Sequence, residues 1–447
     1  MEYQKGISNS RVEYIGGLFK GNLQKVDSKG VLKEVRQFTH QVKLNTPYNS
    51  EMFEFDSFIP QNNPIPNRLG KPSPIKHVFY IIKENRTFDQ VLSDIPGGDG
   101  DTSLLLFGEN ITPNQHKLAK DFVLLDHFFV DAEVSADGHN WSTAAIANDY
   151  TEKTWPTSYG GRGGDYVYEG QSITARPLKG FIWDHAKSAN ISYRTYGEFA
   201  DNYQANIPAL KGQFCPYFTS WDENIRDTTR FSQWKRDFDS LLLINKVPQL
   251  NTLRFINDHT EGVRKDRPTP FAHIADNDYA VGLFVEYLSK STIWNQSVVF
   301  ILEDDAQNGA DHIDAHRSTA YVAGGLVKNH FIDHTTYSTS SMLRTIELIL
   351  GMSPMSQYDV SAKSMWRCFQ DSANGMIFHS VLPKVDLNEK NTMTNSKSHS
   401  YLMQQSEKLN LEHEDMADEH LMNDLLWKYV HGVNAKLPPI KRQLFNY

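Results

Sequence analysis

The chain has 447 residues, of which 39% are hydrophobic and 22% are charged, a composition typical of globular domains. Its formal net charge is -9 and it has no run of basic residues, so we expect no nucleic-acid partner. Two cysteines, Cys215 and Cys368, are too few for a disulfide framework or a thiolate cage around a metal. The length suits a large α/β enzyme with insertions.

No targeting or membrane segment is visible in the chain. The amino-terminal residues contain no apolar stretch of signal-peptide length, and no other segment approaches the length of a membrane span. We therefore expect no transmembrane segment. As written, the chain reads as cytoplasmic, whereas a truncated start would allow a periplasmic or secreted protein.

The first 74 residues are expected to lie outside the catalytic domain. In residues 11–27 apolar and polar side chains alternate and glycines mark turns, which predicts two short strands. In residues 32–45 the apolar side chains have helical spacing. Together they form a predicted amino-terminal unit over 1–45. Residues 46–74 contain six prolines and are expected to be an extended linker that crosses the surface.

From residue 75 onward, apolar β-type runs alternate with amphipathic segments. Strands are predicted at 77–82, 122–125, 192–196, 298–302 and 319–327, and helices at 181–189, 272–289 and 340–350. This alternation indicates an α/β fold, a doubly wound and mainly parallel sheet with helices on both faces. We expect one catalytic domain over 75–368, and over 369–447 a polar loop (388–400) and a closing helix (415–430) packed on that domain.

The strongest chemical signal follows the strand predicted at 298–302. That strand runs into Glu303, Asp304 and Asp305, and His312 and His316 follow within eleven residues of the last acid. Ligands collect at the carboxyl ends of strands in open α/β sheets, and carboxylates and imidazoles bind divalent cations. A solvated loop or a helix start would also explain adjacent acids, but the two histidines favour a metal site.

Two other segments offer further ligands. Glu84 and Asn85 follow the strand at 77–82, and His259 lies in Asn-Asp-His before the long helix. Oxygen ligands suit a hard or borderline cation, and the histidines could form a second, nitrogen-richer position. Two metals about 4 Å apart would clamp the attacking and leaving oxygens of a phosphoryl displacement.

The nucleophile is expected among hydroxyls near strand ends, and the candidates are Ser135, Ser142, Thr143 and Thr87. Ser135 ends an apolar stretch and could instead cap a helix that begins near Asn140, since Ser is a preferred N-cap. The two roles are compatible, because the N–H groups of a helix start bind phosphate oxygens well.

Four segments together resemble one family. They are I-K-E-N-R-T-F-D (82–89), V-S-A-D-G-H-N-W-S (134–142), N-D-H-T (257–260) and E-D-D-A-Q-N-G-A-D-H-I-D-A-H-R (303–317). In this order they resemble the phosphoesterase family, which groups bacterial phospholipases C with AcpA-type acid phosphatases in the alkaline phosphatase-like superfamily. The resemblance spans residues 75–366. Residues 14–27 also resemble the last strands of a β-propeller, which implies a propeller remnant before the esterase domain.

The resemblance implies roles for individual residues. Glu84, Asn85, Asp304 and Asp305 match the family's metal and substrate ligands, and His312 and His259 match histidines of its Asp-His motifs. Ser135 is the expected nucleophile. His316 is a weaker candidate ligand.

We therefore expect a metal-dependent hydrolase of phosphate esters, either a phosphatase or a phospholipase C-like phosphodiesterase, with one or two divalent cations (Mg, Mn, Ca or Zn). Ser135 would attack phosphorus, activated by the cation, and Asn85 would stabilise a phosphate oxygen. His312 and His259 would complete a second metal site or protonate the leaving oxygen. The expected substrate is a phosphorylated small molecule or lipid.

Two alternatives stay open. One is a catalytically degenerate binding module of the same fold, and the other is a different phosphotransferase of the superfamily, such as a phosphoglycerate mutase-like enzyme. A sulfatase is disfavoured because no Cys/Ser-x-Pro-x-Arg motif is present. The sequence does not distinguish monoester, diester and lipid substrates, and it does not fix the metal or the oligomeric state.

Overall fold

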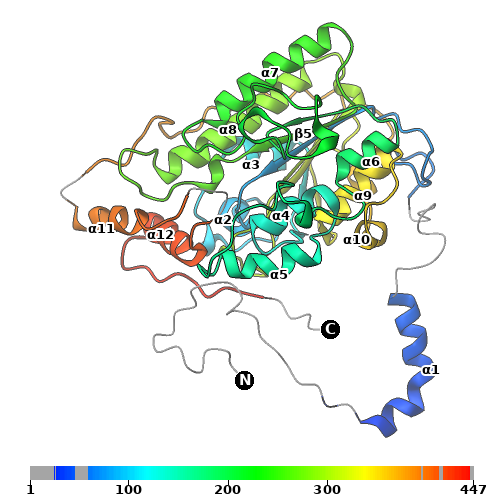
Figure 1. Ribbon diagram of the computed structural model, residues 1–447, viewed down its shortest axis with the longest axis horizontal. Coiled ribbons are helices and arrows are strands. Elements are labelled where there is room, and N and C mark those ends of the chain that lie inside the picture. Colours follow the sequence, from blue (N-terminus) through cyan, green and yellow to red (C-terminus); the bar gives the residue numbers. More distant parts are fainter. Residues whose placement is uncertain (1–24, 26, 46–58, 394–395, 412–415, 443–447) are drawn as a thin grey trace.

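The computed structural model describes residues 25, 27–45, 59–393, 396–411 and 416–442 (Figure 1). The two strands and the propeller-like edge predicted over 11–27 lie outside the described residues, except for residues 25 and 27. The helix predicted at 32–45 is confirmed as α1 (Ser28–Asn45). No helix in the described part of the chain combines the length and the apolar character that crossing a membrane requires.

A seven-stranded sheet forms the centre of the molecule, in the order β4-β5-β1-β6-β7-β2-β8. Its strands are β1 (His77–Lys83), β2 (Val123–Leu125), β4 (Tyr193–Tyr196), β5 (Leu250–Phe255), β6 (Ser297–Glu303), β7 (Ala320–Gly324) and β8 (Phe331–Asp333). β1 pairs in parallel with β5 and with β6, whereas β7 is antiparallel to β6 and to β2. The sheet is thus mainly parallel, as predicted. β3 (Phe128–Phe129) and β9 (Tyr337–Ser338) form a separate parallel pair.

Helices cover both faces of this sheet, which confirms the predicted doubly wound α/β class (Figure 1). Side chains alternate along a strand, so β1 contributes to two cores. Phe79 and Ile81 pack in the core that contains α3 (Pro113–Asp121), α7 (Asp227–Leu243) and α8 (Pro270–Ser289). Val78 and Tyr80 pack in the core that contains α6 (Ile182–Ser188) and α9 (Thr339–Leu350).

The remaining helices are α2 (Phe88–Leu92), α4 (Ser135–Ala144), α5 (Asp149–Ser158), α10 (Gln357–Ser361), α11 (Lys397–Ser406) and α12 (Glu419–His431). α11 occupies part of the predicted polar loop at 388–400, so that expectation is wrong from residue 397 onward. Ser396 caps this helix, and its buried side chains include Leu402 and Met403. Two buried apolar side chains are too few to give an apolar stripe that is visible in the sequence.

The proline-rich segment is described from residue 59. Ile59, Ile65 and Ile75 are buried in the same core as α6 and α9. This part of the segment therefore packs against the α/β domain through single apolar side chains spaced between its prolines.

The aromatic core under α7 and α8 gives the first testable prediction. Phe284 is fully buried, with its ring centroid 4.0 Å from Trp234 and 5.8 Å from Phe79. We expect Phe284→Ala to lower the free energy of unfolding by about 3–5 kcal/mol, because it removes apolar contacts and leaves a cavity. The control is Leu243→Ala, at a side chain that is 84% exposed, and it should alter the free energy of unfolding by no more than about 0.5 kcal/mol. Equal effects in urea denaturation would contradict this assignment of the core.

Candidate active site

The candidate site lies where β1 and β6 end. The parallel register pairs Lys83 with Glu303, so the next residues, Glu84 and Asp304, leave the sheet side by side. The Asp304 N–H donates to the Lys83 carbonyl oxygen at 3.1 Å. The sequence predicted this juxtaposition correctly, because neighbouring parallel strands end at the same edge of a sheet.

A buried lysine pairs with two acidic residues at the strand ends that carry the site. Lys83 Nζ lies 2.6 Å from Glu303 and 2.7 Å from Asp258, and none of the three side chains is more than 1% exposed. Burial lowers the pKa of Lys83, but the two carboxylates outweigh burial and raise it, so the ammonium stays charged. This ion cluster joins the ends of β1 and β6 to the short turn Asn257–His259 that follows β5.

Ser135 lies at the first position of α4 and faces the carboxylates. Its hydroxyl lies 3.0 Å from Asp305 Oδ2 and 3.3 Å from Glu84 Oε2, and the side chain is fully buried. The expected helix start near Asn140 was wrong, because α4 already begins at Ser135. The cap is instead made by Asp137, which accepts from the Val134 N–H at 2.9 Å. The Ser135 hydroxyl is therefore directed to the site rather than used in capping.

Gly138 allows α4 to approach the end of β6 closely. A Cβ at this position would lie 2.8 Å from Asp304 Oδ2 and 3.0 Å from the Asp304 carbonyl oxygen. A side chain of any size would therefore push α4, and Ser135 with it, away from Asp304.

Sequence reasoning missed the residues that surround Glu84. The guanidinium of Arg254 donates to Glu84 Oε1 at 2.9 and 3.0 Å and to Glu169 at 2.9 Å, and its Nη2 lies 2.6 Å from His139 Nε2. The His139 Nδ1 atom lies 3.3 Å from Glu198. All five side chains are fully buried. Arg254 belongs to the buried strand β5, whose sequence Leu-Asn-Thr-Leu-Arg-Phe is half polar and gave no clear signal of a buried strand.

This network controls the charge of Glu84 and His139. Burial raises the pKa of Glu84, but Arg254 and His139 outweigh burial and lower it to about 2. Burial and Arg254 lower the pKa of His139, but the carboxylates of Glu198, Glu169 and Asp304 raise it well above its ordinary value. Glu84 is therefore ionised at every physiological pH.

The donor set fits a divalent cation. Among the described residues, five buried carboxylates lie near two buried basic groups, and a divalent cation would balance the negative charge of the carboxylates. The carboxylates are Glu84, Glu169, Glu198, Asp304 and Asp305, and the basic groups are Arg254 and His139. Ligand atoms of Glu84, His139 and Asp304 all lie within 4.8 Å of one another. Glu84 and Asp304 offer the oxygen ligands expected for a hard or borderline metal, whereas His139, with its raised pKa, is a poor ligand while it is protonated.

Asn85 adds a buried side-chain amide to the site, with a donor and an acceptor that a ligand would satisfy. It is fully buried with φ of 68°, and neither atom of its side-chain amide has a hydrogen-bond partner among the described residues. An unsatisfied buried amide is costly, and a ligand oxygen would satisfy its N–H groups.

His259 lies close to the carboxylates, as expected. It is fully buried, its Nδ1 lies 2.9 Å from the Thr260 carbonyl oxygen, and its Nε2 lies 3.3 Å from the Gln307 amide nitrogen. The backbone N–H of Gln307 donates to Asp305 Oδ1 at 2.5 Å. The side chain of Gln307 thus connects His259 to the loop that carries Asp305.

The structure places His312 in a second cluster. Its Nδ1 lies 2.6 Å from Asp89, and ligand atoms of Asp89, Asp311 and His312 lie within 4.8 Å of one another. The buried Arg317 donates to Asp89 at 2.9 Å and to Asp311 at 3.0 Å. Asp99 Oδ1, from the Gly/Asp-rich loop at 97–101, lies 3.4 Å from His312 Nε2. The contacts of His312 are therefore with this cluster rather than with Glu84 and Asp304.

His316 forms ion pairs with acidic residues of its own neighbourhood and not with Glu84 or Asp304. Its Nε2 lies 3.1 Å from Glu133 and its Nδ1 lies 2.8 Å from Asp314. Burial lowers the pKa of His316, but Asp314 and Glu133 outweigh burial and raise it to about 9. A protonated ring is a poor metal ligand at neutral pH.

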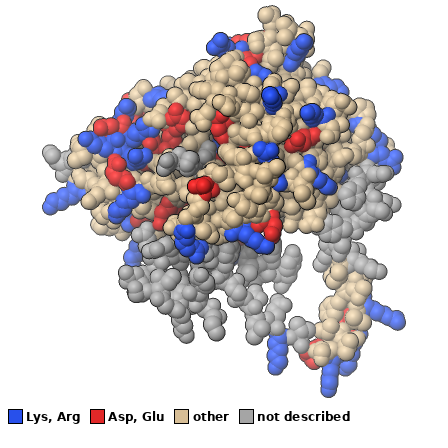
Figure 2. All heavy atoms as spheres, in the orientation of Figure 1, with Lys and Arg blue, Asp and Glu red and all other residues tan. Residues whose placement is uncertain are grey.

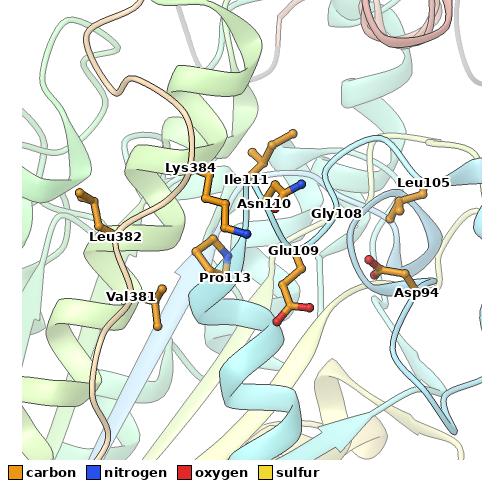
Figure 3. Close-up of a pocket in the computed structure, with 10 residues that line it drawn as sticks. All are labelled: Asp94, Leu105, Gly108, Glu109, Asn110, Ile111, Pro113, Val381, Leu382 and Lys384. Atoms are coloured by element: carbon orange, nitrogen blue, oxygen red, sulfur yellow. The ribbon is translucent and has the colours of Figure 1, made fainter.

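One pocket of the molecule lies elsewhere. It has a volume of about 530 Å³ and is formed by the start of α3, the segment before it and residues 381–384 (Figure 3). Its acidic lining residues, Asp94 and Glu109, are paired with His116 and Lys120. None of the predicted site residues lines this pocket.

Comparison with known proteins assigns the family. The model of the phosphoesterase family matches residues 97–353, more than half of the chain, so this chain belongs to that family. It is accordingly a hydrolase that acts on ester bonds. No curated protein sequence matches the chain.

Solved structures with a similar arrangement share little sequence with this chain. A protein of the alkaline phosphatase superfamily from Vibrio parahaemolyticus is 15% identical over 75% of this chain and 78% of its own, with a TM-score of 0.44. Human ectonucleotide pyrophosphatase/phosphodiesterase 5 is 11% identical over 67% and 100%, with a TM-score of 0.42. The lipoteichoic acid synthase LtaP from Listeria monocytogenes is 13% identical over 88% and 98%, with a TM-score of 0.44.

The close approach at Gly138 can be tested directly. We expect Gly138→Ala to lower hydrolysis of p-nitrophenyl phosphate by about tenfold or more, because a shift of about 1 Å in Ser135, the expected nucleophile, is sufficient for such a loss. The control is Gly98→Ala, where the nearest atom would lie 3.4 Å from the new Cβ. Unchanged activity of Gly138→Ala, with an unchanged circular dichroism spectrum, would contradict the packing of α4 on Asp304.

The ion pairs of His316 predict a pH dependence of stability. Because the folded state raises the pKa of His316 from 6.5 to about 9, the stabilisation is complete below pH 6.5 and is lost as the pH rises through 9. We expect His316→Gln to cost on the order of 2 kcal/mol at pH 6 and almost nothing at pH 9.5. Urea denaturation at the two pH values measures the difference. His379→Gln, at a side chain 70% exposed, is the control, and a cost for His316→Gln that does not change with pH would refute the ion pairing.

Proposed function

We propose that this protein is a metal-dependent hydrolase of phosphate esters that uses Ser135 as its nucleophile. The observation that carries the proposal is the position of the Ser135 hydroxyl, at the start of α4, 3.0 Å from Asp305 and 3.3 Å from Glu84. A phosphoryl group placed there would meet the nucleophile, the helix start and the carboxylates together. The family is in agreement with this reaction class.

The side chains support a two-step displacement. As Ser135 Oγ forms a bond to phosphorus, its proton would pass to Asp305, 3.0 Å away, while the bond from phosphorus to the leaving oxygen breaks and that oxygen takes a proton from His259. Water would then attack the same phosphorus and release phosphate or a phosphomonoester. The proton of the water would return to His259, and Asp305 would return its proton to Ser135. A divalent cation held by Glu84, Asp304 and Asp305 would neutralise these carboxylates and polarise the phosphoryl group.

Asn85 would stabilise the charge that develops on the phosphoryl group. Its buried amide N–H groups need an acceptor, and a non-bridging phosphate oxygen provides one. Arg254 would act as a positioning residue, because it fixes Glu84 through two hydrogen bonds.

The three predicted histidines receive different proposals. For His259 we keep the role of protonating the leaving oxygen or of binding a second cation, because the Thr260 carbonyl fixes its Nδ1 and turns Nε2 toward the Asp305 loop. For His312 we propose a cation position shared with Asp89 and Asp311, separate from the first. For His316 the ion pairs favour a role in holding the loop 303–317 beside Glu133.

The substrate proposed is a phosphorylated small molecule or lipid, bound by the domain over 75–368. We further propose that residues 369–447 act as its carboxyl-terminal cover. Asn423 Nδ2 of α12 donates to the Gln307 carbonyl oxygen at 2.7 Å, and Asn391 and α11 lie against the loop that follows His259.

The decisive experiment compares Ser135→Ala with Ser142→Ala. Both side chains are buried in α4, so the two changes are matched in size and burial, but among the two hydroxyls the carboxylate contacts belong to Ser135. We expect Ser135→Ala to lower turnover of p-nitrophenyl phosphate and bis-p-nitrophenyl phosphate by about 10³-fold or more, and Ser142→Ala to leave it within a few fold. EDTA should abolish the activity of wild type, and one of Mg²⁺, Mn²⁺, Ca²⁺ or Zn²⁺ should restore it.

Three outcomes would overturn parts of the proposal. Full activity in Ser135→Ala would move the nucleophile to another hydroxyl. Activity that survives EDTA would refute the metal dependence. If the protein binds phosphate but hydrolyses neither ester with any of the four metals, the result would favour the degenerate binding module instead.

A further inference from the structure

The helix α1 has a side that no other part of the described structure covers. Leu32, Val35 and Phe38 recur every three residues and are 70%, 47% and 44% exposed. Figure 1 shows α1 apart from the helices that pack on the sheet. By contrast, the equally amphipathic α9 buries its whole length in the core. Three large apolar side chains in one exposed stripe are unusual for a helix that serves only as a spacer.

A basic stripe borders this apolar stripe. Lys29, Lys33, Arg36 and His40 follow one another at intervals of four, three and four residues, which keeps them on one side of a helix with 3.6 residues per turn. They flank the side of Leu32, and all four are exposed. Figure 2 shows Lys and Arg side chains extending from this helix. The whole chain carries a net charge of -9, so the positive charge of this stripe is opposite in sign to the net charge of the protein.

We propose that α1 binds the surface of a membrane that contains anionic lipids. Such a surface satisfies both stripes along the whole helix, because Leu32, Val35 and Phe38 enter the acyl boundary while the cations meet lipid phosphates. Nucleic acid would pair with the cations but would leave the apolar stripe in water. A second α1 helix would cover the apolar stripe, but its only acidic residue is Glu34, so it would leave the cations without counter-charges.

The proposal concerns a surface outside the candidate active site and does not depend on the proposed reaction. It does place the enzyme at a surface that carries phosphate esters. The binding is electrostatic and hydrophobic at once, so it should weaken as salt is added, and it should disappear when either stripe is removed.

Co-sedimentation of the full chain with vesicles tests the proposal. We expect at least about tenfold more binding to phosphatidylcholine/phosphatidylglycerol vesicles than to pure phosphatidylcholine, and a strong loss of that binding at 0.5 M salt. The double variants Lys33→Glu/Arg36→Glu and Leu32→Ser/Phe38→Ser should each lower binding by about tenfold or more. Hydrolysis of p-nitrophenyl phosphate in solution should be unchanged in all of them, which separates this test from that of the reaction.

Matched controls change exposed side chains of the α/β domain. Lys179→Glu/Lys211→Glu makes the same change of charge, and Leu178→Ser/Leu243→Ser removes two leucines that are 107% and 84% exposed. Both control variants should bind vesicles as wild type does. Absence of binding to the anionic vesicles, or equal binding of the α1 variants and wild type, would overturn the proposal. A dimer in light scattering that Leu32→Ser/Phe38→Ser converts to monomer would also overturn it and assign the stripe to a second copy.

Discussion

The burial of charge at the carboxyl edge of the central sheet is the constraint on which the rest of the site depends. Carboxylates from β1, β6 and their flanking segments are buried together there, and each would be too costly to bury alone. Two buried cations make the arrangement possible. Lys83 neutralises Glu303 and Asp258 below the site, and Arg254 holds Glu84 and Glu169 beside it.

These ion pairs leave a surplus of negative charge in one place. Asp304 and Asp305 face α4, and the helix can come close enough to present Ser135 because Gly138 has no side chain. The loop that carries Asp305 is held by α12, and His316 of the same loop pairs with Glu133, two residues before Ser135. Packing thus fixes the positions of Ser135, Asn85 and the carboxylates, which is the preorganisation that the proposed phosphoryl transfer would require.

Much of this could be read from the sequence, and the parts that could not have physical reasons. Apolar strands such as β1 and β6 are visible because both of their faces are buried, and their parallel register brings Glu84 beside Asp304. β5 and α7 were missed because their buried polar residues break the pattern. Arg254 lies inside β5, and Asp227 and Arg230 form a buried ion pair at the start of α7. The role of His139 depends on contacts with Glu198 and Arg254, which are distant in the chain.

By itself the sequence determined the class of fold and the acids at the strand ends, because both follow from local patterns and from the edge at which parallel strands end. Among hydroxyls it offered four candidates, of which Ser135 stays a prediction. Only the tertiary structure decided which histidines share the site. His312 and His316 are near Asp305 in the chain, yet Arg317 binds Asp89 and Asp311 and turns this loop so that His312 meets Asp89. His259 comes close instead, because its turn is tied to Lys83 through Asp258. The path of a loop follows the buried charges that it must pair, and those partners lie far away in the sequence.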